Sequence, residues 1–63
     1  MGHPNIFTKD IAEYLSVTLD VAEEIQNVID IYFNLDWSEA DQFEMHMTYI
    51  AAYDFYKKSI LKI

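Results

Sequence analysis

The residues of this chain that could do chemistry are mostly carboxylates, and several of them recur at helical spacing. Glu23 and Glu24 follow Asp20 by three and four residues, so a helix would make them neighbours about 5–6 Å apart. One helical turn rises about 5.4 Å, roughly the spacing of successive phosphates along a nucleic-acid strand. We therefore expect an acidic face that meets the lysine and arginine side chains of another protein, formed by Asp20, Glu23, Glu24, Asp30, Glu39 and Asp41.

Catalytic and metal-binding patterns are absent from the sequence. His46 is the only histidine outside the first few residues, and Glu44, two positions away, falls on a different side of a helix. Asp41 and Glu44 are spaced to hold a cation weakly, but a solvated helix face is the simpler interpretation. The chain has neither a glycine-rich phosphate loop nor a nucleophile motif. We expect no enzyme activity, no metal and no cofactor.

The charge is strongly acidic and unevenly distributed. The chain has eleven acids, four lysines and no arginine, for a net charge of −7. All of these acids lie from Asp10 to Asp54, an interval without a single Lys or Arg. A sustained negative potential repels nucleic acid and attracts basic partners. The alternative interpretation is that the acidity serves only solubility.

Length and composition indicate one small domain that spans residues 1–63. The chain has no cysteine, so neither a disulfide nor a thiolate metal site can stabilise it. Hydrophobic residues make up 52% of the chain and aromatic residues 16%, which argues against disorder. No apolar run approaches the roughly 20 residues of a membrane span, and no secretory signal is visible. We expect a cytosolic protein whose residues 1–5 are flexible or a cloning remnant.

The spacing of apolar residues predicts an all-α fold with three helices. Apolar residues recur at helical intervals, and strand-type alternation does not persist. The first helix is expected at 8–16 with Thr8 as its N-cap, and the second at 18–33 with Thr18 as its N-cap. A long C-terminal helix is expected from about 37 to 61, capped by Asp36 or Ser38.

The long C-terminal helix has apolar residues on two sides, and such a helix needs two neighbours. One side holds Ala40, Phe43, Met47, Ile50 and Ala51, which the first two helices can cover. The other side carries the tyrosines, with little chain left to cover it. We therefore expect a homodimer or target interface formed by Met45, Tyr49, Tyr53, Tyr56 and Ile60. The alternative is that both sides pack internally, since tyrosine is often only partly buried.

Residues 8–25, TKDIAEYLSVTLDVAEEI, resemble the helix-turn-helix of bacterial repressors, closest to the lac-repressor type. The positions that match the interior of that motif are Ile11, Ala12, Leu15, Val17, Ala22 and Ile25. Two positions depart from it: Ser16 stands where glycine is usual, and Ala22 where valine or isoleucine is preferred. The resemblance implies a DNA reader, but the second helix presents acids where phosphate contacts demand Lys or Arg. Direct nucleic-acid binding is therefore not expected.

Two functional hypotheses follow from the sequence. The first is a small acidic inhibitor or regulator, encoded by a phage or mobile element, that imitates DNA and blocks a nucleic-acid-binding or otherwise basic protein. Small phage inhibitor proteins are similar to this chain as a class, being short, acidic, helical and free of cysteine. The second is a degenerate helix-turn-helix regulator or structural interaction module whose acidity is only solubilising.

Overall fold

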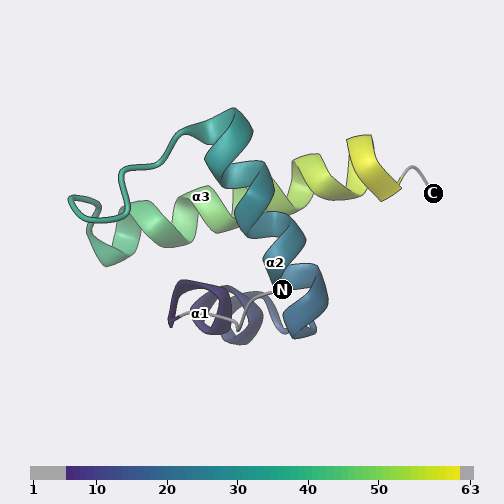
Figure 1. Cartoon of the computed structure of the whole chain (residues 1–63), viewed down its shortest axis with the longest axis horizontal. Helices are drawn as coiled ribbons and strands as arrows, with labels where there is room; N and C mark the ends of the chain where they lie inside the picture. Colours follow the sequence, from purple (N-terminus) through teal and green to yellow (C-terminus); the bar gives the residue numbers. More distant parts are fainter. Residues whose placement is uncertain (1–5, 62–63) are drawn as a thin grey trace.

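Three helical segments make up the chain in a computed structural model that describes residues 6–61, with only the backbone of residues 60 and 61. The segments are α1 (Ile6–Leu15), α2 (Leu19–Val28) and α3 (Gln42–Phe55). A short π-helical segment continues each of the last two helices: η1 (Ile29–Phe33) follows α2, and η2 (Tyr56–Leu61) follows α3. In Figure 1, α2 runs steeply across the other two helices, and η2 prolongs α3 toward the C-terminus. No strand occurs in the described range, which confirms the all-α, three-helix fold. The expectation for residues 1–5 lies outside the described residues.

The turn between α1 and α2 depends on a left-handed residue. Ser16 has a φ of 58°, and the Val17 amide donates to the Ala12 carbonyl at 3.0 Å. This pattern is the ordinary left-handed termination of a helix, which glycine usually provides. Thr18 then caps α2, as predicted, by accepting a hydrogen bond from the Val21 amide at 3.2 Å. The chain therefore makes the tight turn of a helix-turn-helix without the usual glycine.

The first helix begins before the residue predicted to cap it. Thr8 lies inside α1 and is buried, where its hydroxyl donates to the Gln26 side chain of α2. The prediction of an N-cap at Thr8 is therefore wrong. A threonine can serve either role, and here its position between two packed helices gives the hydroxyl a partner on α2 in place of a backbone amide.

The third helix starts later than predicted. The Asp36 carboxylate accepts from the amide and the hydroxyl of Ser38, which closes a turn in the 34–41 loop. Asp41 instead caps α3, because its Oδ1 accepts from the Glu44 amide at 2.8 Å. The predicted start of this helix near residue 37 is therefore wrong. Two capping sequences compete within six residues, and only the second continues into an apolar helical pattern. The predicted end at Phe33 is confirmed, and the helical turns after α3 continue to Leu61, the last described residue.

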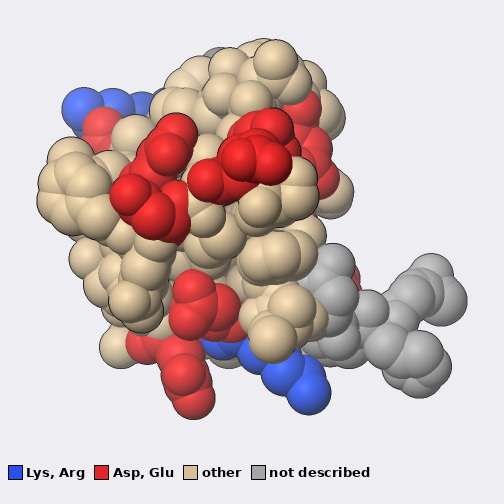
Figure 2. All heavy atoms as spheres, turned by 90° about the vertical axis from the view of Figure 1, so that its left-hand side faces the viewer, with Lys and Arg blue, Asp and Glu red and all other residues tan. Residues whose placement is uncertain are grey.

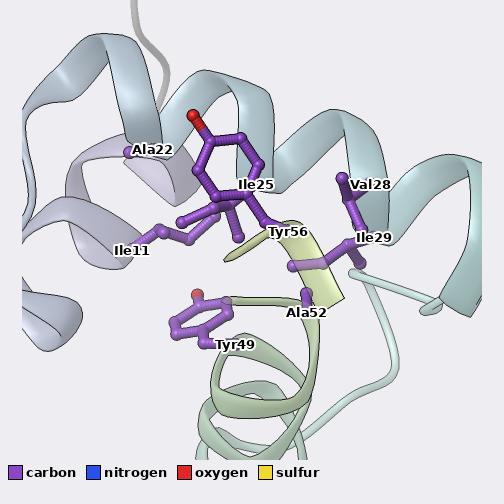
Figure 3. Packing of buried hydrophobic residues seen from close by; sticks show 8 residues of the cluster. All are labelled: Ile11, Ala22, Ile25, Val28, Ile29, Tyr49, Ala52 and Tyr56. Carbon is purple, nitrogen blue, oxygen red and sulfur yellow. The ribbon is translucent and has the colours of Figure 1, made fainter. Parts of the chain in front are cut away.

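The core lies where α2 and η1 meet one side of α3. Its buried apolar residues are Ile11, Ala22, Ile25, Val28, Ile29, Tyr49, Ala52 and Tyr56. Figure 3 shows Tyr49 and Ala52 on α3 and Tyr56 on η2 turned toward the isoleucines of the other helices. Ala22 and Ala52 are fully buried. Both positions are enclosed by neighbouring helices, so a larger side chain at either one would have to displace its neighbours.

The structure buries the tyrosine side of α3 and exposes the other side, the reverse of the prediction. Tyr49 is 0% exposed and Tyr56 only 4%, whereas Phe43 is 74%, Met47 53% and Ile50 48% exposed. Tyrosine can be buried when its hydroxyl finds a partner at the edge of the core. The Tyr49 hydroxyl donates to Asp10 Oδ2 at 2.9 Å, which satisfies that need.

A substitution at the left-handed turn tests this part of the fold. We expect Ser16→Gly to raise the free energy of unfolding by up to about 1 kcal/mol, because a Cβ disfavours this conformation by about 1–2 kcal/mol. The greater freedom of glycine in the unfolded chain offsets part of the gain. Urea denaturation measures the change. Ser38→Gly is the control and should lower the free energy of unfolding, since Ser38 has no positive φ and its hydroxyl donates to Asp36. A Ser16→Gly protein no more stable than the parent would contradict the assigned turn.

Candidate functional site

All six acids predicted to meet a partner lie on the surface. Asp20, Glu23 and Glu24 project from α2, Asp30 from η1, Glu39 from the 34–41 loop, and Asp41 from the N-cap position of α3. Figure 2 faces the side of the molecule that carries this loop and shows several separate groups of carboxylates there, with lysines toward its edges. The acids therefore form a broad negative surface over two helices and a loop. They do not form one cluster.

Half of these acids also have a structural partner. The carboxylate of Asp30 accepts from the Trp37 indole nitrogen at 2.9 Å, and Asp41 caps α3. A hydrogen bond to Glu24, with burial, raises the pKa of the Tyr56 hydroxyl above its ordinary value. By contrast, the side chains of Asp20, Glu23 and Glu39 make no hydrogen bond or ion pair with other residues of the described range. These three are the acids most available to a partner.

The lysines do not neutralise this surface. Lys58 pairs with Asp54 at 3.3 Å, one helical turn earlier, and the Lys57 ammonium lies 4.6 Å from the centre of the Tyr53 ring. Both contacts lie toward the far end of α3. Within residues 6–61, none of the six acids has a lysine partner. The negative potential over α2 and the loop is therefore uncompensated by side chains of the described part of the chain.

An open apolar groove lies beside the acids at the start of α3. It has a volume of about 550 Å³ and is lined by Phe33, Asp41, Phe43, Glu44, Met47, Thr48 and Ala51. The prediction that Phe43, Met47 and Ala51 pack against the first two helices is therefore wrong. The two apolar sides of this helix indicate from the sequence that one side stays uncovered, but they do not indicate which one.

The predicted interface around the tyrosines is corrected by the structure. Tyr49 and Tyr56 are core residues of the chain itself and cannot meet a partner without unfolding. Met45 and Tyr53 are half-buried against the same core, and the Ile60 side chain lies outside the described residues. The exposed apolar side of α3 is therefore the Phe43 and Met47 side.

A polar and aromatic cluster joins α1 to α3. Asp10 accepts from Tyr49 and lies 3.8 Å from His46 Nε2, while the His46 ring stacks on Tyr14 with centroids 3.9 Å apart. Burial, reinforced by the Asp10 hydrogen bond, raises the pKa of Tyr49 well above its ordinary value. The cluster includes no serine, cysteine or lysine nucleophile. Its evident role is to tie α1 to α3.

Two further properties of the described residues bear on function. No three of their His, Asp or Glu side chains gather in a way that could hold a metal ion. None of the helices within residues 6–61 is both long and apolar enough to cross a membrane. Comparison of the chain with protein-family models, with curated proteins and with solved structures found no match. The arguments for function therefore rest on the surface itself.

The tie between Tyr49 and Asp10 predicts a loss of stability at alkaline pH. In the unfolded chain Tyr49 ionises near pH 10, whereas in the folded chain it stays protonated, so stability falls as pH rises above about 10. Tyr49→Phe should reduce this fall by up to about 1.4 kcal/mol per pH unit. Urea unfolding between neutral and strongly alkaline pH measures it.

The control for this experiment is Tyr32→Phe, which alters a ring that is 63% exposed. At neutral pH, Tyr49→Phe should cost about 1 kcal/mol through loss of the hydrogen bond to Asp10. If Tyr49→Phe left the alkaline slope unchanged, or if Tyr32→Phe reduced it equally, the role given to the buried hydroxyl would be contradicted.

Proposed function

We propose that this protein is a small acidic inhibitor or regulator that binds a basic, nucleic-acid-binding protein in the cytosol and blocks its nucleic-acid surface. A phage or mobile element is the source that suits such a protein. The observation that carries the proposal is the uncompensated negative surface. Six exposed acids lie over α2, η1 and the following loop, and no described lysine pairs with them.

In this proposal the acids of α2 imitate the phosphates of a nucleic acid. Asp20 stands one helical turn before Glu23 and Glu24, a spacing comparable with that of successive backbone phosphates. A protein that binds nucleic acid presents lysines and arginines to such a row. The long-range field of the acids would steer this partner to the surface, and salt would weaken the association.

A helix-turn-helix regulator is the second candidate, and one observation favours it. The left-handed Ser16 gives α1 and α2 the tight connection that the repressor motif uses. The second helix of that pair nevertheless carries the three acids, and its Thr18 hydroxyl is occupied as a cap. Phosphate contacts dominate the affinity of DNA-binding domains, so this surface favours a protein partner.

The proposal is tested by removing charge without removing size. A tagged chain is used to capture its partner from a bacterial lysate, and the purified complex is then measured by calorimetry. We expect Glu23→Gln with Glu24→Gln to weaken binding by roughly 3- to 30-fold at low salt, since each exposed charge pair is worth up to about 1 kcal/mol. The difference should shrink as salt is added.

The control removes the same charge elsewhere, through Glu13→Gln with Asp54→Asn. Glu13 is exposed on α1 and Asp54 pairs with Lys58, so neither belongs to the α2 row. Equal losses in the two double variants would show that total charge alone matters, which would leave solubility as the reason for the acids. A clear retardation of duplex DNA by the parent protein at low salt would instead favour the regulator.

A further inference from the structure

The groove on α3 is an apolar surface that the described part of the chain leaves open. Phe43, Met47 and Ala51 succeed one another at intervals of four residues, so they form one stripe along α3. Phe33, at the end of η1, also lines the groove. Its ring packs edge to face on Phe55, with the ring centroids 6.4 Å apart, and this contact helps to hold Phe33 in position.

The length of the groove suits a helix as its occupant. The stripe from Phe43 to Ala51 covers nine residues of helix and rises about 12 Å, which matches about two turns of a second helix. An amphipathic helix fills such a groove with apolar residues at positions i, i+3 or i+4, and i+7. An extended strand would need a sheet edge, and the described residues contain no strand.

The charge at the rim selects among helices. Asp41 and Glu44 line the groove, and none of the lysines within residues 6–61 does so. Asp41 is held in place by its hydrogen bond to the Glu44 amide, so its negative charge stays at the helix start. A second copy of this chain would bring another net charge of −7 and set these carboxylates against its own acids. A helix with lysine or arginine beside its apolar stripe meets both features of the groove.

We propose that this groove binds an amphipathic basic α-helix of the partner. The inference rests on the proposed function for the basic nature of that partner, and it adds the contact that gives specificity. In this arrangement Phe43 and Met47 bury apolar side chains of the helix, while Asp41 and Glu44 meet its cations. The acids of α2 supply attraction over a longer range.

A defined peptide tests the proposal without knowledge of the natural partner. The probe is a synthetic leucine–lysine peptide of about 18 residues whose leucines follow helical spacing, long enough to form a helix on binding. A second peptide has the same composition in scrambled order. Both are titrated into the isotope-labelled full chain by NMR and calorimetry. We expect the helical peptide to bind at least tenfold more tightly and to shift signals of Phe33, Phe43, Met47 and Ala51.

A matched pair of variants assigns the binding to the groove. Met47→Gln should weaken the helical peptide by about tenfold or more, because burial of a methionine side chain is worth about 1.5–3 kcal/mol. Ile31→Gln is the control, since Ile31 is 70% exposed and does not line the groove. Both changes lie on the surface, and circular dichroism confirms that each variant is folded.

Four results would overturn the groove proposal. The first is equal binding of the scrambled peptide, and the second is equal weakening by Ile31→Gln. The third is self-association in sedimentation that Met47→Gln abolishes, which would assign the groove to a second copy of the chain. The fourth is a set of peptide-induced shifts on Asp20 and Glu23 alone, which would contradict the groove proposal but leave the binding of a basic partner by the α2 acids intact. Conversely, if Glu23→Gln with Glu24→Gln did not weaken partner binding while the groove results held, the groove proposal would stand and the role of the α2 acids would be contradicted.

Discussion

The burial of Tyr49 is the interaction on which the rest of this structure depends. Its ring is completely enclosed, and its hydroxyl reaches Asp10 on a helix 39 residues away in the chain. The contact fixes the rotation of α3 relative to the other helices. With that rotation set, Ala52 and Tyr56 also face inward. Within the described residues, which include no cysteine, this core covers one side of α3.

The exposed surface of α3 is a consequence of this burial. Because the tyrosines are inside, Phe43 and Met47 remain outside, beside the carboxylates of Asp41 and Glu44. Lys57 and Lys58 of η2 stand near Tyr53 and Asp54, away from the start of α3. Apolar area and negative charge thus lie together on one side of the molecule. This combination favours recognition of a cationic protein through both long-range attraction and close apolar contact.

Local signals in the sequence predicted much of the fold. The three helices, the cap at Thr18 and the exposure of the α2 acids all follow from residue spacing and capping chemistry. The start of α3 did not, because Asp36 and Asp41 both resemble caps and their competition is decided by the turn at Ser38. The buried side of α3 depends on distant partners for the tyrosine hydroxyls. Helical periodicity marks two apolar sides but carries no information on which one meets Asp10.

The most direct test of which side of α3 is exposed and binds a partner compares the two methionines of this helix, which point to different sides. Met45 packs against the core, whereas Met47 is 53% exposed in the groove. Their methyl signals can be followed by NMR with a soluble paramagnetic agent, first alone and then with a bound basic helix. We predict stronger broadening of Met47 in the free protein and its selective protection in the complex. Stronger broadening of Met45, or no protection of Met47 on binding, would contradict the account.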